Sequence, residues 1–564
     1  MRRVTTVLLG FLVLSLIRVA SVAASSAPIR TKNGMVVSQN AIASEVGAEV
    51  LKEGGNAIDA AIATAFALAV THPTAGNIGG GGFLVYRPSQ GEPVTYDFRE
   101  MAPAKATPTM FLENGEYDFD RHHLSHLSVG VPGTVAGLHM AWTEQGSLPW
   151  KRLVAPAIDL ARDGFVVTDG LARSLNRVLP RMEKYPASVK KFTKNGVPYE
   201  MGDVLKQPDL SRALERIAEG GPAGFYEGET AELIEKEMLA NGGLITKQDL
   251  ENYQPKKRLP VRGTYRGYEV LSMPPPSSGG TILIEMLNII EGFDVGDAGF
   301  GSARSLHVMA ESMRRAFADR ARYLGDPEFN PEIPVDRLIS KRYADELRKT
   351  IRANDASKSS PDSFVWTSES PETTHFSVVD HKRNAVALTY TLEFGYGSGI
   401  VVPGGGFLLN NEMGDFNAGP GLTDERGLIG TQPNLVAPGK RMLSSMTPAI
   451  LAKEGKLFMV TGSPGGRTII NTVLQTILNV VDHGMNAQDA VGAGRIHHQW
   501  LPDQIRHERH GFSPDTLAIL KKMGHELREI EAQGAANVIV FNHEDDMLEA
   551  GIDRRPADSG AAGH

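Results

Sequence analysis

The alternation of apolar and polar positions predicts a chain in which helices and strands alternate. Apolar residues follow a helical period over residues 41–70, with a break at Gly54-Gly55, after which Asn56 is placed to cap an Ala-rich buried helix. Shorter strand-like runs occupy residues 94–98 and 385–390. Strands that alternate with helices indicate an α/β fold.

The same patterns predict the remaining elements more coarsely. Helices are predicted at residues 153–162, 209–219, 281–291, 302–321, 468–483 and 487–493. Strands are predicted at residues 407–410 and 538–541 and near Leu548, and residues 449–457 and 458–461 are predicted to form a hairpin. The Gly- and Pro-rich residues 419–440 are predicted to form a lid over a site.

Four consecutive glycines, residues 79–82, precede an apolar strand and could cradle a phosphate. However, no Lys-Ser or Lys-Thr pair follows them, and a strand rather than a helix comes next. These two facts exclude a P-loop and a dinucleotide-binding loop. We therefore expect a tight turn of the backbone.

Composition describes an ordinary soluble globular protein. The 564 residues are 41% hydrophobic and 22% charged, and the net charge is −8. The chain has no basic run or patch, so we expect no nucleic-acid partner. Because cysteine is absent, the protein forms no disulfide and has no thiol nucleophile.

The N-terminus has the pattern of a secretory signal. Met1-Arg2-Arg3 is followed by an apolar core over residues 7–17 and by the small residues Val22-Ala23-Ala24. The apolar core is too short for a membrane span and Arg18 follows it, so we expect residues 1–24 to be removed. Removal takes away three arginines and gives a mature net charge of about −11. An exported chain without disulfides is expected in a bacterial periplasm or outside the cell.

The transition from linker to strand at Thr373 is the most informative stretch. Residues 353–371 are polar and irregular, whereas a strand pattern begins directly after Glu372. Cleavage between Glu372 and Thr373 would give Thr373 an α-amine, which titrates at about 7.7–8.0 and can accept the proton of its own hydroxyl. Threonine is also simply common in strands, so Thr-Thr alone predicts no more than a strand.

The sequence of residues 373–380, Thr-Thr-His-Phe-Ser-Val-Val-Asp, resembles the start of the small subunit of γ-glutamyltranspeptidases. These are self-cleaving N-terminal-nucleophile hydrolases, and the resemblance runs from about Lys32 to the last twenty or so residues. It implies a four-layer αββα sandwich built as one globular unit from a large subunit, residues 25–372, and a small subunit, residues 373–564. It implies no cofactor and no metal, and His497-His498 lacks a partner at a zinc-binding spacing.

The resemblance also implies the catalytic residues. Thr373 would attack the γ-carbonyl of a glutamyl amide, and Thr391 would donate or accept a hydrogen bond at the nucleophile. Thr389 lies on the same strand face, and only the resemblance favours Thr391 over it. Main-chain amides at Gly465 and Gly466 would form the oxyanion hole.

A γ-glutamyl group carries a free α-carboxylate and a free α-ammonium, so its pocket needs both a cation and anions. The resemblance assigns the carboxylate to Arg99, which can fork onto it, and to the pair Ser444 and Ser445. It assigns the ammonium to Glu412 and Asp415. Without the resemblance, these residues would read as a surface arginine, a serine loop and a solvated acidic turn.

Glu393 departs from the family pattern, in which an asparagine lies two residues after the second threonine. A third carboxylate near Glu412 and Asp415 would be repulsive in an empty site and would raise pKa values there. It would either strengthen binding of the ammonium group or point away from the pocket.

The resemblance implies an exported γ-glutamyltranspeptidase that hydrolyses glutathione and related γ-glutamyl amides or transfers the glutamyl group to amino acids and peptides. One alternative is an acylase of the same fold that acts on glutaryl or cephalosporin amides. Another is an exported binding protein that has lost catalysis. Arg99 and the acids favour the transpeptidase over the acylase, and the intact threonines and glycines argue against a binding protein.

Overall fold

The computed structural model describes residues 25–360, 373–422 and 431–564. The predicted signal sequence, Glu372 and the centre of the predicted lid lie outside these residues.

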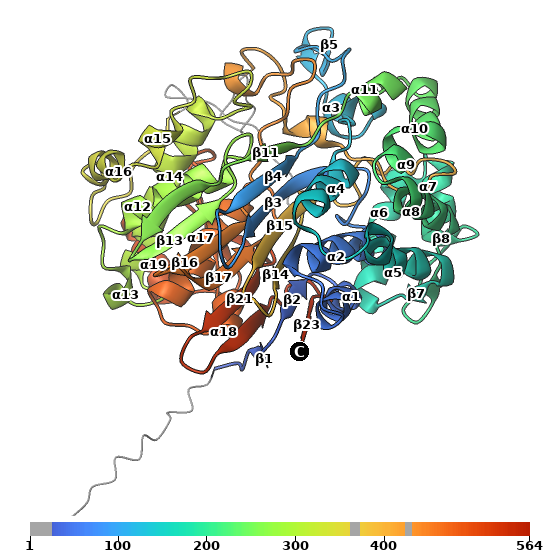
Figure 1. Ribbon diagram of the computed structural model, residues 1–564. Helices are drawn as coiled ribbons and strands as arrows, with labels where there is room; N and C mark the ends of the chain where they lie inside the picture. The colour runs from blue at the N-terminus through green and yellow to red at the C-terminus, as the bar shows by residue number, and fades with distance from the viewer. Residues whose placement is uncertain (1–24, 361–372, 423–430) are drawn as a thin grey trace, which may run out of the picture.

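Two seven-stranded antiparallel sheets form the centre of the molecule (Figure 1). The first sheet has the order β11 (Lys256–Arg258), β4 (Val94–Phe98), β3 (Gly81–Arg87), β15 (Ala385–Thr391), β14 (Thr374–Val379), β2 (Met35–Ser38) and β23 (Gly560–Gly563). The second has the order β1 (Ile29–Thr31), β22 (Met547–Ile552), β21 (Asn537–Asn542), β17 (Lys456–Gly462), β16 (Ala449–Lys453), β13 (Tyr268–Ser272) and β12 (Val261–Tyr265). Both sheets contain strands from each side of Thr373, so the two halves of the chain build one unit.

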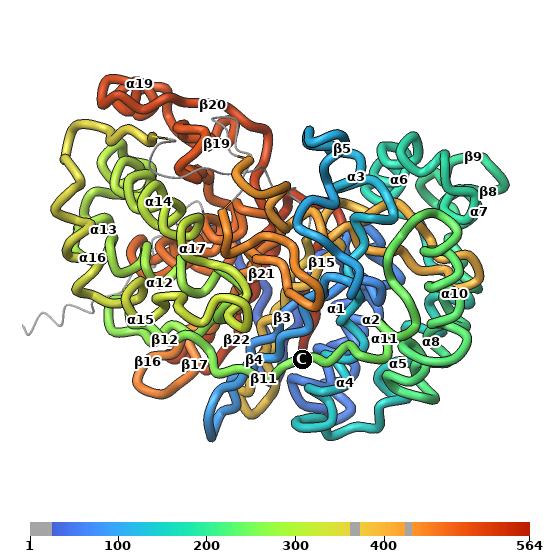
Figure 2. Tube along the Cα trace, turned by 90° about the horizontal axis from the view of Figure 1, so that it is seen from above, coloured from blue at the N-terminus to red at the C-terminus, as the bar shows by residue number. Residues whose placement is uncertain are grey.

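Helices cover the outer face of each sheet, and Figure 2 shows them on opposite sides of the strands. The first sheet is covered by α1 (Ala41–Lys52), α2 (Ala57–Thr71) and α4 (Thr134–Gln145). The second is covered by α12 (Gly279–Ile290) and α17 (Thr468–Val481), and α14 (Ala303–Tyr323) packs on α12. This is the four-layer αββα sandwich that the family resemblance implies, and it confirms that expectation.

Further helices extend these two outer layers. Beside α2 lie α5 (Trp150–Asp163), α6 (Asp169–Met182), α7 (Pro186–Phe192), α8 (Pro208–Gly220), α9 (Ala223–Tyr226), α10 (Gly228–Ala240) and α11 (Lys247–Glu251). On the other side lie α13 (Val295–Ala298), α15 (Val335–Leu338), α16 (Lys341–Arg348), α18 (Ala487–Gly492) and α19 (Pro514–Lys522). Within the described residues, no helix combines the length and the apolar character needed to cross a membrane.

Each layer boundary has its own apolar core, because central strands of a sandwich are buried on both faces. On β14, Phe376 and Val378 belong to the core between the first sheet and its helices. Val379 belongs to the core between the two sheets, together with Ile450 and Val460 of the second sheet. The alternation follows from the two-residue period of a strand.

The predicted helical hairpin near the N-terminus is confirmed. α1 and α2 are separated at Gly54, whose φ of 93° favours glycine. The Asn56 side chain accepts from the backbone N–H groups of Ile58 and Asp59, and Asp59 closes a capping box. Every residue of α2 is buried, as its Ala-rich composition predicts.

Two strand predictions need correction. Residues 407–410 form no strand, because only Leu408 makes a bridge, with Val401. The predicted hairpin of residues 449–461 exists, but its turn lies at Glu454-Gly455, where both residues have positive φ, rather than after residue 457. The sequence patterns also missed the last strand, β23, whose small residues carry no apolar alternation.

Candidate active site

Strand register brings Thr373 and Thr391 to one edge of the first sheet. Within the β14–β15 pair, Thr374 lies opposite Tyr390 and His375 lies opposite Thr389. Thr373 directly precedes β14, so the same antiparallel register places it opposite Thr391. The antiparallel pairing of β14 and β15 therefore explains why two threonines eighteen residues apart in the sequence lie side by side.

The neighbouring strands end at the same edge. Thr391 lies opposite Gly81 on β3, and Gly82 lies opposite Phe98 on β4, so Arg99 follows at the same level. A Cβ atom at Gly80 would lie 2.1 Å from the carbonyl oxygen of Thr391, and one at Gly81 would lie 2.4 Å from that of Phe98. The glycine run thus permits close backbone packing around the edge, rather than the positive φ of a tight turn.

One small cavity of about 20 Å³ opens at this edge. It is lined by Arg99, Thr373, Thr391, Glu393, Glu412, Asp415, Ser444, Ser445, Met446, Gly466 and Ile469. Nine of the ten predicted site residues are among them, and the tenth, Gly465, precedes Gly466 in the chain. Thr389, which the strand pattern could not separate from Thr391, instead forms a hydrogen bond of 2.8 Å to His375.

The glycine pair lies between β17 and α17. Gly465 and Gly466 have φ values of 133° and 54°, and a Cβ at Gly465 would lie 2.4 Å from the hydroxyl of Thr468. Thr468, the first residue of α17, donates its hydroxyl to the carbonyl of Gly465 at 2.7 Å. Backbone amides at the start of a helix favour negative charge, as an oxyanion requires.

Arg99 is fully buried and forms ion pairs with Glu412 and Asp415. It also donates to the carbonyls of Met442 and Leu443, each at 3.3 Å. Burial opposes the charge of Arg99, but the two carboxylates outweigh it and raise its pKa above the ordinary value.

The acids around Arg99 are less well satisfied. Burial raises the pKa of Glu412 and of Glu100, whose carboxylate lies 3.6 Å from the guanidinium of Arg99. Among the described residues, neither oxygen of Glu100 nor the Oε2 atom of Glu412 has a hydrogen-bond partner. Glu412, which lines the pocket, therefore has a buried acceptor atom that a cation from outside can use.

The serine pair is supported by a residue that the sequence patterns missed. Arg320 of α14 is buried and donates to the hydroxyl of Ser445 at 2.8 Å and to that of Ser278 at 2.7 Å. Ser278 in turn donates its hydroxyl to the carbonyl of Ser444. In the sequence Arg320 is one of several arginines in the same helix, and nothing local reveals its distant partners.

Glu393 faces the pocket and has an unexpected neighbour. Its carboxylate accepts a hydrogen bond from Asn411 and lies 3.2 Å from the Nδ1 atom of His123, the last residue of α3 (Phe119–His123). Nothing in the sequence near His123 indicated a place in the pocket.

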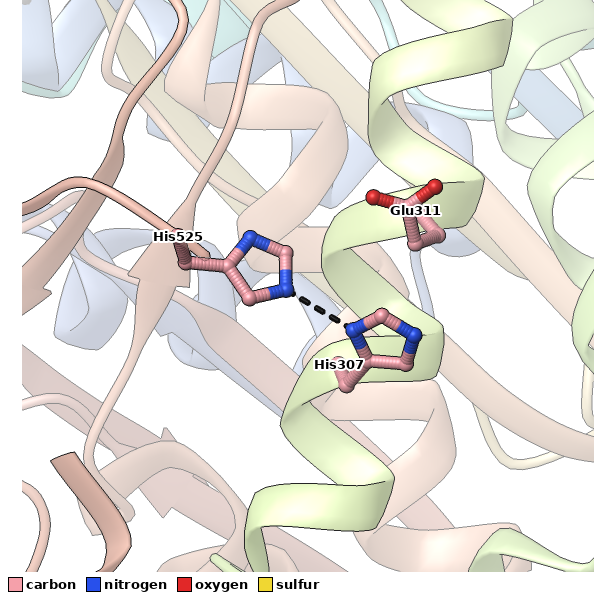
Figure 3. A group of neighbouring side chains, drawn as sticks. All are labelled: His307, Glu311 and His525. Carbon is pink, nitrogen blue, oxygen red and sulfur yellow. Dashed lines mark hydrogen bonds between the residues drawn. The ribbon is translucent and has the colours of Figure 1, made fainter. Parts of the chain in front are cut away.

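A separate buried cluster gathers His307, Glu311 and His525 (Figure 3). His307 and Glu311 lie on α14, and the Nδ1 atom of His307 is 2.8 Å from the Nε2 atom of His525. Both carboxylate oxygens of Glu311 already accept hydrogen bonds from Arg314, Arg315 and Ser357. These contacts describe a hydrogen-bonded structural network. The sequence patterns had singled out other histidines, His375, His497 and His498, and these are bonded to neutral or acidic side chains nearby.

Among the described residues, two larger cavities lie outside the small pocket. One, of about 580 Å³, is lined by Thr373 and by polar residues that include Gln39, Ser174 and Arg177. Thr373 is the only residue shared by its lining and that of the small pocket. The other, of about 750 Å³, is lined by none of the predicted site residues.

Comparison with known proteins agrees with this geometry. The family model described as Gamma-glutamyltranspeptidase matches residues 43–563. The chain is 50% identical to the glutathione hydrolase proenzyme of Escherichia coli (strain K12) over 544 residues, which cover 95% of this chain and 93% of the relative. Cephalosporin acylase from Bacillus halodurans has a similar structure, with a TM-score of 0.84, 28% identity and coverage of 97% and 98% of the two chains. The γ-glutamyltranspeptidase of Helicobacter pylori is 48% identical with a TM-score of 0.58, over 58% of this chain and 95% of that one.

Proposed function

Because the chain belongs to the γ-glutamyltranspeptidase family, we propose that it cleaves the γ-glutamyl amide bond of glutathione and related compounds through Thr373. The glutamyl group then passes to water or to the amine of an amino acid or peptide. The observation that carries the proposal is the single cavity that joins Thr373 to Arg99 and its acids.

The same hydroxyl acts twice in this proposal. In the precursor, the Thr373 hydroxyl attacks the carbonyl of Glu372, and the C–N bond breaks as the nitrogen takes the hydroxyl proton to become the α-amine of Thr373. Glu372 is then held as an ester on the Thr373 oxygen, and water hydrolyses that ester to free the Glu372 carboxylate and restore the hydroxyl. In the mature enzyme, that amine takes the hydroxyl proton as the oxygen attacks the γ-carbonyl of the donor. The amide nitrogen leaves with a proton, and water or an amine cleaves the resulting ester. Thr391 holds the nucleophile, and the amides near Gly466 stabilise the oxyanion.

The ionic pairs of the empty pocket match the amino-acid end of a donor. Arg99 is paired with Glu412 and Asp415 in the structure. A donor brings one carboxylate and one ammonium, so the carboxylate can take the guanidinium while the ammonium takes the acids. The exchange replaces the internal ion pairs of Arg99 with ion pairs to the donor, at both its carboxylate and its ammonium. The small volume of the cavity implies that side chains move apart when the donor enters.

The larger cavity beside Thr373 suits the other half of the donor. Thr373 lines both cavities. When the amide bond of a donor lies at the Thr373 hydroxyl, the glutamyl side of the donor would occupy the small pocket and the amine side would occupy the larger cavity. The exposed guanidinium of Arg177 is a suitable contact for the terminal carboxylate of a leaving peptide or of an acceptor.

The acylase alternative differs in the charge that it needs. A glutaryl group lacks the α-ammonium, and the buried acids around Arg99 would then stay uncompensated. We expect turnover of a γ-glutamyl anilide to exceed that of the matching glutaryl amide by a wide margin. Comparable rates on the two substrates would favour the acylase.

The central test is Thr373→Ala. Without the hydroxyl, the precursor stays one uncut chain and has no γ-glutamyl transfer or hydrolysis. Thr374→Val is a matched control, because the neighbouring Thr374 hydroxyl is buried without a partner among the described residues. We expect that control to be cut and active. Normal cleavage of Thr373→Ala would overturn the assignment of the nucleophile.

Mass spectrometry of the purified protein tests the maturation steps together. We propose export to the periplasm or the medium after removal of residues 1–24 and cleavage before Thr373. Two polypeptides starting near residue 25 and at Thr373 are the expected result. A single chain that retains Met1 would contradict both steps.

A further inference from the structure

Glu393 is held at the pocket wall by an unusual backbone. Its φ is 77°, in the left-handed region that few non-glycine residues adopt, and its N–H donates to the hydroxyl of Thr391 at 2.8 Å. The carboxylate is buried and lines the same cavity as Glu412 and Asp415. A carboxylate in this position needs donors that keep it in place, and Asn411 supplies one.

His123 supplies the second donor, and its protonation state is determined by its surroundings. An ionised carboxylate only accepts hydrogen bonds, so opposite an ionised Glu393 the Nδ1 atom of His123, at 3.2 Å, carries the proton. Burial lowers the pKa of His123 to about 4, so the ring is neutral near pH 7. His123 therefore orients Glu393 without cancelling its charge.

Three separate segments fit together around this hydrogen bond. The ring of Phe394 stacks on that of His123, with centroids 5.1 Å apart and an interplanar angle of 8°. A Cβ atom at Gly414 would lie 2.4 Å from the Nδ1 atom of His123 and 2.8 Å from the Oε1 atom of Glu393. Gly414 thus leaves space for the pair, directly beside Asp415 of the pocket.

We propose that His123 is a positioning residue that holds the Glu393 carboxylate at the ammonium end of the donor pocket, where Glu393 is a third acid for recognising the donor's α-ammonium. The inference rests on the proposed function. It places Glu393, which stands where the family pattern has an asparagine, in the wall of the pocket. It also identifies His123 of α3 as the residue that orients the Glu393 carboxylate. It also predicts that this chain selects strongly for donors with a free ammonium group.

The test separates the hydrogen bond from the ring stacking. His123→Phe keeps an aromatic ring against Phe394 but removes the donor, whereas His123→Asn keeps an N–H near the Nδ1 position but removes the ring. We expect His123→Phe to raise the KM of a γ-glutamyl anilide about tenfold, the effect of a lost hydrogen bond to a charged group. The kcat should stay within about twofold, and His123→Asn should restore most of the KM.

Two inhibitors report on the ammonium directly. L-glutamate carries the α-ammonium and glutarate does not, and both otherwise fill the same pocket. His123→Phe should weaken inhibition by glutamate about tenfold and leave that by glutarate nearly unchanged. Equal losses for both would indicate a general disturbance of the pocket and would overturn the proposal, as would an unchanged KM.

A double variant identifies the residue through which His123 acts. In the Glu393→Asn background, His123→Phe should have no further effect on KM, because the carboxylate that it orients is gone. Additive losses would refute the pairing. His126→Phe is the matched control, since His126 forms a partly buried pair of 3.0 Å with Glu237 outside the pocket lining, and the donor KM of this variant should not change.

Failure of this inference can be told apart from failure of the proposed function. All His123 variants retain Thr373 and should still be cut into two subunits with measurable kcat. If the parent enzyme itself were uncut or inactive on γ-glutamyl anilide, the proposed function would fall. If the parent enzyme is cut and active, and only the KM and inhibition values of the His123 variants differ from those expected, the role of His123 is wrong and the proposed function stands.

Discussion

Two buried charged clusters of this molecule contain similar residues but differ in how well the residues are satisfied. Around Arg99, burial raises the pKa of Glu412 and Glu100, and three of their four oxygens have no hydrogen-bond partner among the described residues. Around Glu311, burial is outweighed by Arg314, Ser357 and Arg315, and the pKa of Glu311 falls to about 2. Both of its oxygens accept hydrogen bonds.

The difference shows how one fold uses buried charge in two ways. The lowered pKa of Glu311 shows that its charged form gains more from its partners than burial costs, so this acid favours the folded chain above the pH range in which it titrates. A cluster whose acids lack partners is unfavourable when empty and gains most from a ligand that completes it. By this criterion we propose that the Arg99 cluster binds the donor. The Glu311 cluster holds the chain around Ser357 against α14 through two hydrogen bonds from Ser357.

The largest expected effect is on Arg99. Arg99→Met removes the only pocket cation that the donor carboxylate can use among the described lining residues. We expect kcat/KM for a γ-glutamyl anilide to fall on the order of 10³-fold, as for other truncated buried ion pairs. Steady-state kinetics on the cleaved enzyme provides the measurement.

A control in the other cluster sharpens this prediction. Arg314 is buried and is paired with Glu311 and Asp503, so Arg314→Met should lower stability but keep the donor KM. Equal losses of kcat/KM in the Arg99 and Arg314 variants would break the distinction between the two clusters.

The second expected effect is on folding. Glu311→Gln removes the carboxylate that pairs with Arg315 and one of the two that pair with Arg314, which keeps Asp503. The new amide nitrogen cannot accept from Ser357. We expect the free energy of unfolding to fall by about 3 kcal/mol, as for a broken buried pair. Urea denaturation measures the loss, and the donor KM should stay within about twofold. Reduced donor affinity with unchanged stability would reverse the roles that we assign.

Much of the fold followed from local patterns in the sequence. The helix pair α1 and α2, the strand after Thr373 and the hairpin β16–β17 carry clear apolar periods and turn residues. The pairing of strands from both halves into two sheets came from the family resemblance. It could not come from periodicity, since partners such as β2 and β23 lie at opposite ends of the chain.

The site was less accessible to local reasoning. The resemblance identified the residues of the pocket, and strand register explains why Thr373, Thr391 and Arg99 meet. Supporting residues such as Arg320 and His123 were missed, because their partners are distant in sequence and reach them only through tertiary packing. The choice between two orientations of Glu393 also needed the structure.

The smallest expected effect concerns a buried histidine two residues after Thr373. His375 forms hydrogen bonds with the hydroxyls of Thr389 and Ser377, at 2.8 and 3.1 Å. Like Glu311, it is a buried group whose polar atoms have partners. Burial lowers its pKa to about 3, whereas an unfolded histidine titrates at about 6.5. Between these values the unfolded chain binds one more proton, so stability is fully present above pH 6.5 and is lost as the pH falls.

The expected slope is about 1.4 kcal/mol per pH unit for this one group. His375→Gln keeps a polar side chain that can bond both hydroxyls and takes up no proton in this range. In the uncut Thr373→Ala background, we expect urea unfolding at about pH 7 and about pH 5 to show a smaller difference for His375→Gln than for its parent. Because each protein is compared with itself at the two pH values, any change in the free energy of unfolding that the substitution causes at both values cancels. An identical pH dependence in both proteins would mean that His375 can be protonated in the folded chain. Its surroundings would then not favour the neutral ring, and the comparison with the Glu311 cluster would fail.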